Sequence, residues 1–216
     1  MEWNGTTKSS TLQPDVVKTR HRLADAAKAF NWEKMISLLE ENDMYLNAND
    51  IRPDGRAQYS PLHQAALGNA PETVIKQLID MGAFRTLRNA NNERPIDIAK
   101  ANHYTAIYDV LEPEYKRKVP PDHLAKLQTH LYTVIKTRVN DLVEKEKLRL
   151  PPLEIMLELE EPEIWFPVPG MYGGFSITMD GEGEEAILIS SSWCRVSGGS
   201  GQRHEITANG SELVEE

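Results

Sequence analysis

One pattern recurs along the first half of the chain and limits what that half can fold into. The segment Ser60-Pro61-Leu62-His63-Gln64-Ala65-Ala66 is followed by paired aliphatic residues at helical spacing and then by Met81-Gly82-Ala83. About 34 residues later the same order begins again at Arg94-Pro95-Ile96. A period of this length is typical of stacked units, each too small to bury its own apolar face.

The landmarks of the pattern have physical reasons. Pro61 suits the first turn of a helix, where its missing N–H is not needed, and Ser60 can cap the same helix. Gly82 follows the paired aliphatics, where a positive φ can close a helix end. A more degenerate copy starts at Leu23-Ala24, about 39 residues before the second one. The extra length fits a longer loop around residues 51–55.

The motif resembles the ankyrin repeat, whose hydroxyl residue, Pro, Leu, His, any residue and Ala are matched by residues 60–65. The resemblance implies an α-solenoid of about three repeats over residues 15–113. It also implies that Ser60 and His63 lock the turn to the helix, so His63 is structural. The next repeat has Arg94 and Asp97 at these positions, where an ion pair can replace the lock.

The flanking segments differ from the repeats. Residues 1–14 are rich in Thr, Ser, Asn and Gly and are predicted to form a flexible tail. Residues 114–150 are predicted as a helical cap or connector, because apolar residues recur every three or four positions from about Pro121 to Leu148. We expect this long C-terminal helix to cap the last repeat, and a coiled-coil dimer is the alternative.

After Pro151-Pro152 the pattern changes to short runs with period two. Residues 164–166, 175–179, 186–190 and 204–207 read as strands, and Asn209-Gly210 reads as a hairpin turn. Residues 151–216 are therefore predicted as a small antiparallel β module. The chain as a whole is expected to be α+β: an ankyrin-repeat α-solenoid, a long capping helix and this module.

The complete layout resembles that of bacterial ankyrin-repeat proteins in which a few repeats precede a module of this type. The residues that carry this likeness are 165–175, which begin Trp-Phe-Pro-Val-Pro-Gly, and 197–207, which begin Ser-Gly-Gly-Ser-Gly. The resemblance implies an architecture and no particular activity.

Composition narrows the class of partner. The formal net charge is −9, which disfavours nucleic acid and suits a basic protein, although the charge can also serve solubility alone. The single cysteine, Cys194, excludes an intramolecular disulfide and fits a reducing compartment. No apolar run is long enough to cross a bilayer. We therefore expect a cytoplasmic monomer that binds neither membrane nor nucleic acid.

The first functional hypothesis is a protein–protein interaction adaptor, including a neutralising or regulatory binder, that uses the concave face of the repeats. It requires no cofactor, metal or catalytic residue. The candidate contacts lie on the loops and inner helices, where Arg and Tyr often dominate interface energy. They are Arg52, Arg56, Gln58, Tyr59, Gln64, Leu67, Asn91, Asn92, Glu93, Lys100 and His103.

The alternative is a small-ligand sensor or enzyme whose site lies in the β module. A Gly/Ser loop precedes a polar cluster there, and backbone N–H groups of such a loop can hold an anion. The candidate residues are Arg195, Arg203, His204 and Glu205, and Cys194 with His204 could form a nucleophile and its base. Strand alternation argues against one pocket, because it places His204 on the face opposite Arg203 and Glu205.

Overall fold

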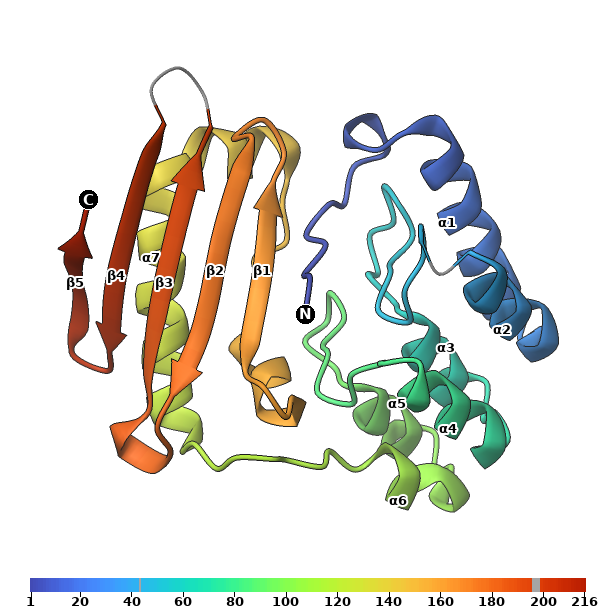
Figure 1. The fold of residues 1–216 in the computed structure, drawn as a ribbon. Helices are drawn as coiled ribbons and strands as arrows, with labels where there is room; N and C mark the ends of the chain where they lie inside the picture. Colours follow the sequence, from blue (N-terminus) through green and yellow to red (C-terminus); the bar gives the residue numbers. More distant parts are fainter. Residues whose placement is uncertain (43, 196–198) are drawn as a thin grey trace. The chain divides into compact units, whose positions relative to one another are not determined.

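A computed structural model describes residues 1–42, 44–195 and 199–216. The chain divides into two compact units, a helical unit of Thr7–Glu114 and a sheet unit of Met1–Thr6 with Tyr115–Glu216. The architecture is α+β, with several helices in the first unit and a five-stranded antiparallel sheet in the second (Figure 1). None of the described helices combines the length and apolar character that crossing a membrane requires.

The helical unit is a double row of short helices. Its helices are α1 (Pro14–Lys28), α2 (Trp32–Glu41), α3 (Pro61–Leu67), α4 (Glu72–Asp80), α5 (Pro95–Ala101) and α6 (Tyr108–Leu111). Two 3₁₀ turns, η1 (Ser9–Thr11) and η2 (Thr105–Ile107), precede α1 and α6. Helices α1, α3 and α5 contact one another in sequence, and α2, α4 and α6 do the same. Long loops, of which the first is described over residues 44–60 and the second spans 81–94, connect one helix pair to the next.

The backbone of this unit repeats at the interval that the sequence predicts. The N–H groups of Asn31, Ala70 and Tyr104 each donate to the carbonyl five residues earlier, at 3.0, 2.9 and 3.0 Å. The residue before each of them has a left-handed φ, of 56°, 47° and 59°. The same tight turn therefore joins the two helices of each pair, at spacings of 39 and 34 residues.

Small residues allow the inner row to pack closely. Ala65 and Ala66 on α3, and Ala99 on α5, are fully buried. A methyl group fills little space between two helix axes, so the backbones approach one another. Larger aliphatics such as Leu62 and Leu78 are also fully buried and fill the layer between the two rows.

The sheet unit contains a five-stranded meander, as the sequence predicts. Its strands are β1 (Glu163–Val168), β2 (Gly173–Asp180), β3 (Ile187–Cys194), β4 (Ser200–Thr207) and β5 (Gly210–Glu215), and each pairs antiparallel with the next. Two 3₁₀ segments, η3 (Leu153–Glu158) and η4 (Gly183–Glu185), precede β1 and β3.

The long helix α7 (Pro121–Glu146) covers one face of this sheet and corrects the prediction of a helix that caps the repeats (Figure 1). It contacts β3, β4 and β5. Its apolar stripe, including Leu127, Leu131 and Ile135, is buried, as are Phe166, Phe175 and other residues of the inner sheet face. The stripe is thus covered within its own unit, and the prediction failed because periodicity shows that a helix has an apolar face but not what covers that face.

The N-terminal residues differ from the predicted flexible tail. Glu2 forms a parallel bridge with Trp165 at the edge of β1, and Trp3 is only 3% exposed. The indole N–H of Trp3 donates to the carbonyl of Arg149 at 2.8 Å, and the Arg149 guanidinium lies 5.2 Å from the ring centroid. A buried aromatic ring with a satisfied N–H anchors this segment to the sheet unit.

Candidate functional site

A hollow of the helical unit lies between α1, the loop of residues 50–60 and the start of α3. We call it the α1–α3 groove; its volume is about 280 Å³. The apolar part of its lining comes from residues such as Leu23, Ala27 and Ile51. Five of the eleven predicted contact residues also line it: Arg52, Arg56, Gln58, Tyr59 and Gln64.

A buried ion pair forms one wall of the groove. The Arg20 guanidinium lies 2.7 Å from an Asp50 carboxylate oxygen, and both side chains are nearly inaccessible to solvent. The other Asp50 oxygen accepts the N–H of Asn47 at 3.0 Å. Burial outweighs the favourable charge of Arg20 and this hydrogen bond, and raises the pKa of Asp50 to about 6. A buried pair of this kind fixes the loop geometry more than it adds stability.

The rim of the groove is cationic. Arg52 pairs with Asp25 on α1. Arg56 and Lys28 also line the groove, and neither has a carboxylate partner among the described residues. A site with unpaired cations in a chain of net charge −9 has a local charge opposite to that of the whole molecule.

Loop-to-loop hydrogen bonds hold the groove in shape. The Asn49 side chain donates to the carbonyl of Gly82 at 2.8 Å and accepts the N–H of Phe84 at 2.9 Å. The N–H of Ala90 donates to the carbonyl of Ala57 at 3.0 Å. Successive loops are therefore tied together at their bases and near their tips, which preorganises the side chains that they present.

The predicted lock between turn and helix is present at α3. The backbone N–H of Ser60 points at Nδ1 of His63, at 3.3 Å, and the Ser60 hydroxyl lies 2.8 Å from the same atom. Because Nδ1 accepts from the backbone, Nε2 carries the hydrogen, which the carbonyl of Glu93 accepts at 3.1 Å. The Tyr59 ring stacks on His63 with centroids 5.6 Å apart. His63 thereby joins the loop before α3 to the loop before α5.

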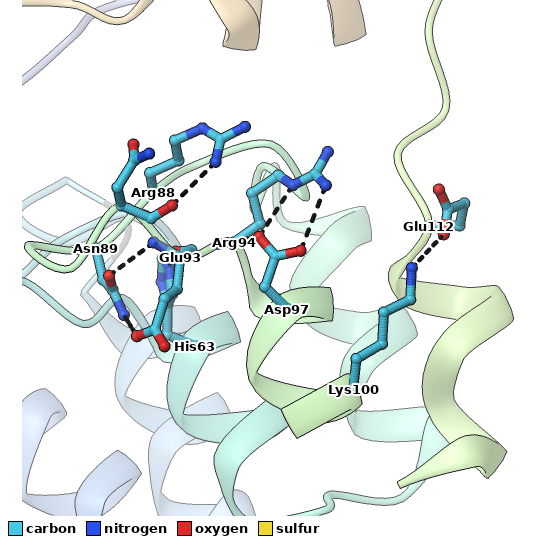
Figure 2. A network of polar contacts seen from close by, with 9 residues as sticks. His63, Arg88, Asn89, Glu93, Arg94, Asp97, Lys100 and Glu112 are labelled. Atoms are coloured by element: carbon cyan, nitrogen blue, oxygen red, sulfur yellow. Dashed lines mark hydrogen bonds and ion pairs between the residues drawn. The ribbon is translucent and has the colours of Figure 1, made fainter. Parts of the chain in front are cut away.

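The tip of the second loop is organised around Asn89, as Figure 2 shows. Its side-chain oxygen accepts the N–H groups of Asn91 and Glu93, at 2.8 and 3.0 Å, and its amide donates to the Glu93 carboxylate at 2.9 Å. Arg88 donates to the carbonyl of Asn92 at 3.0 Å. The half-buried Glu93 is thus engaged within the loop, whereas Asn91 and Asn92 are exposed at its tip.

An ion pair replaces the Ser–His lock at α5. The Arg94 side chain donates to both Asp97 oxygens, at 3.3 and 3.4 Å, and its backbone N–H donates to one of them at 2.9 Å (Figure 2). Burial acts to raise the pKa of Asp97, but the hydrogen bonds and charge of Arg94 prevail and lower it. The pair is the one that the sequence suggested.

The remaining predicted contacts do not lie in the groove. The exposed Lys100 lies 3.7 Å from the Glu112 carboxylate (Figure 2). Leu67 ends α3 and packs against the core, and His103 is an exposed turn residue after α5. Leu67 and His103 therefore lie at the ends of their helices away from the loops.

Among the groove residues that the prediction of partner contacts missed are the two cationic residues of α1, Arg20 and Lys28. The copy of the pattern that begins at Leu23-Ala24 is degenerate, and no partner contact was predicted on its helices. A signal was available: Arg20, Ala24 and Lys28 are spaced four apart and share one helix face.

The four candidate residues of the β module do not converge. His204 points toward α7, while Arg203 and Glu205 are exposed on the other face of β4, as strand alternation indicates. The β4–β5 register shifts between Arg203 and His204, but pairing with β3 stays regular there. Arg195 is exposed after β3. Residues 197 and 198 of the Gly/Ser loop lie outside the described residues.

The suggested Cys194–His204 pair is not formed. The Cys194 thiol donates to the carbonyl of Met171 at 2.9 Å. His204 lies opposite Ser190, four residues from Cys194 along β3, a distance of about 13 Å at strand spacing. Within the described part of the chain, no three His, Cys, Asp or Glu side chains are grouped so that they could hold a metal ion.

Comparison with known proteins adds no family. No protein-family model matches the sequence, and no curated protein is similar enough to count as a match.

Proposed function

We propose that the helical unit binds another protein through the α1–α3 groove, and that its repeats are of the ankyrin type. The observation that carries the proposal is the convergence of Arg52, Arg56, Gln58, Tyr59 and Gln64 in one preorganised hollow. The recurring turn between the helices of each pair, together with the single Ser-Pro-Leu-His motif at residues 60–63, supports the repeat type.

The chemistry of the groove favours an acidic segment of the partner. Arg56 can hold a carboxylate with two parallel hydrogen bonds, and Lys28 adds a second positive charge. Gln58 and Gln64 offer amide groups to a peptide backbone, while Leu23 and Ile51 offer apolar contact. The net charge alone suggested a basic partner, but the groove points to the opposite charge.

The test compares capture of proteins from the cells that express this chain by wild type, Arg56→Glu and Arg203→Glu. Both substitutions reverse an exposed arginine, and only the first lies in the groove. We expect the captured amount of one or more proteins to fall by about tenfold or more with Arg56→Glu and to be retained with Arg203→Glu. The reason is that Arg56→Glu places a carboxylate beside the acidic segment of the partner. Equal capture by all three proteins would exclude the groove as the binding surface.

A further inference from the structure

A second hollow, of about 450 Å³, lies in the sheet unit between α7 and strands β4 and β5. The polar residues that line it are Thr133, Thr137 and Arg138 from α7, Gln202 and His204 from β4, and Ser211 from β5. None of the lining residues is acidic. The hollow therefore combines a fixed positive charge with hydrogen-bonding groups and has no counter-charge of its own.

Arg138 is held in place but not neutralised. One terminal nitrogen of its guanidinium donates to the carbonyl and the hydroxyl of Ser200, both at 2.9 Å. Its Nε is buried and has no hydrogen-bond partner among the described residues. No carboxylate pairs with Arg138 within the described parts of the chain. A partly buried guanidinium that lacks a counter-ion is costly unless something else supplies the negative charge.

His204 lines the same hollow and has a second unused nitrogen. Its Nδ1 is buried without a hydrogen-bond partner among the described residues. Burial first, and then the charge of Arg138, lowers the pKa of His204. The ring is therefore a neutral donor or acceptor near pH 7 and gains a proton more readily when an anion is close.

Two serines of β3 extend the set of unused polar groups. Ser190 and Ser192 lie opposite His204 and Gln202 on the same face of the sheet, and they are 1% and 4% exposed. Neither hydroxyl has a partner among the described residues. Neither serine lines the hollow, but Arg138 and His204 do, and because buried polar groups are nearly always hydrogen-bonded, the unsatisfied nitrogens of these two residues indicate a missing partner.

We propose that this hollow binds the phosphate group of a small molecule, held by Arg138 and His204. Ordered water could satisfy hydrogen bonds but would leave the charge of Arg138 uncompensated. A phosphate carries more acceptor oxygens than a carboxylate and so uses more of the surrounding donors. Among the lining residues, Gln202 contacts an acidic residue: its amide donates to the exposed Glu216 at 3.5 Å, which is a weak hydrogen bond. This site is independent of the α1–α3 groove.

The experiment is a titration of the full chain with inorganic phosphate, followed by NMR of the His204 ring. In the wild type the His204 signals should shift to a plateau, and the pKa of His204 should rise as phosphate binds. Arg138→Gln should weaken binding by about tenfold or more, because it removes a charged hydrogen bond. The matched control is Arg203→Gln, which removes the same charge one residue from His204 on the other sheet face and should change binding by less than about twofold.

Two further measurements keep the result interpretable. Amide exchange of β2 and β3 checks that Arg138→Gln remains folded, and His204→Gln should also weaken phosphate binding if the Arg138 variant does not fold. Acetate at matched ionic strength is the second arm, and it should shift the His204 signals much less than phosphate. A linear, non-saturating response, an equal loss with Arg203→Gln, or a stronger response to acetate would each overturn the phosphate site.

Discussion

The helical and sheet units use their polar side chains in different ways. In the helical unit, Ser60, His63, Asn89 and Glu93 are linked by short-range hydrogen bonds, with partners at most about 30 residues apart. In the sheet unit, Arg138 on α7 and Ser190, Ser192 and His204 on the sheet face that α7 covers retain unused atoms. The linked groups hold the loops of the helical unit in shape, although Arg20 and His21 in that unit also have a buried nitrogen without a partner among the described residues, whereas these unused groups of the sheet unit lie around and beside the second hollow.

The two units also differ in how far apart along the chain their contacting residues lie. Neighbouring repeats form the helical unit, but the sheet unit depends on residues 1–6 from the far end of the chain. We therefore expect substitutions to act within one unit at a time, and the following experiments test or sharpen that contrast.

The largest effect is expected from Trp3→Ala. It removes a buried indole, its hydrogen bond to the carbonyl of Arg149 and its contact with the Arg149 guanidinium, which together should cost the sheet unit about 3–5 kcal/mol. Hydrogen exchange in β1 and β2 measures this loss, while exchange in α3 and α5 should be unchanged.

The counterpart of that experiment is Leu78→Ala in the helical unit, where the side chain is fully buried. Loss of the Leu78 side chain should accelerate hydrogen exchange in α3 and α4 and leave hydrogen exchange in β1 unchanged.

If Trp3→Ala costs less than about 0.5 kcal/mol, residues 1–6 are a loose tail and do not anchor the sheet unit.

A smaller effect is expected from pH, through Asp50. Its pKa is about 6 in the folded unit and 3.8 in the unfolded chain, so the folded state holds more protons between these values. The stabilisation from protonated Asp50 is complete below about pH 4 and is lost as the pH rises through about 6. The shift corresponds to about 3 kcal/mol.

The contribution of Asp50 to the free energy of unfolding can be measured by urea unfolding of the helical unit from about pH 4 to about pH 7. Wild type is compared with Asp50→Asn. The neutral variant cannot titrate at this position, so its stability should decline less over the same range. Parallel curves for the two proteins would show that Asp50 is ionised throughout, with Arg20 dominating over burial.

The smallest effects are expected from substitutions at the N-termini of α3 and α5. Ser60→Ala should cost about 0.5–2 kcal/mol, because it removes a buried cap hydroxyl beside His63. Arg94→Ala should cost about 0–1 kcal/mol, because the Arg94–Asp97 pair is partly exposed and screened by solvent. Thermal unfolding in about 0.1 M salt ranks the two, and a larger loss for Arg94→Ala would reverse the assigned roles of the two locks.

The sequence predicted the features that depend on local pattern. The period of the helix pairs, the Arg94–Asp97 pair and the antiparallel strands all follow from neighbours along the chain. The opposite orientation of Arg203 and His204 follows from strand alternation alone. The position of Arg52, Arg56, Gln58 and Tyr59 at the groove also follows, because they lie on the loop that connects two helix pairs; whether they contact a partner stays a prediction.

The missed features depend on contacts between distant residues. The stripe of α7 could not identify the sheet as its partner, and Trp3 lies in a polar segment without any period. Arg138 and His204 are 66 positions apart, on two elements whose pairing no local pattern specifies. The burial of the Ser190 and Ser192 hydroxyls likewise appears only when α7 is placed over β3.

The anchoring of Trp3 has a consequence for biosynthesis. Its indole partner, the carbonyl of Arg149, is made 146 positions later, and Trp165 later still. At a translation rate of about 5–20 residues per second, the indole waits roughly 7 to 30 s for its first contact. The helical unit can assemble during that interval, because partners such as His63 and Glu93 are only 30 positions apart. Residues 1–6 are therefore among the last of the described residues to reach their native place, although they are synthesised before the rest of both units.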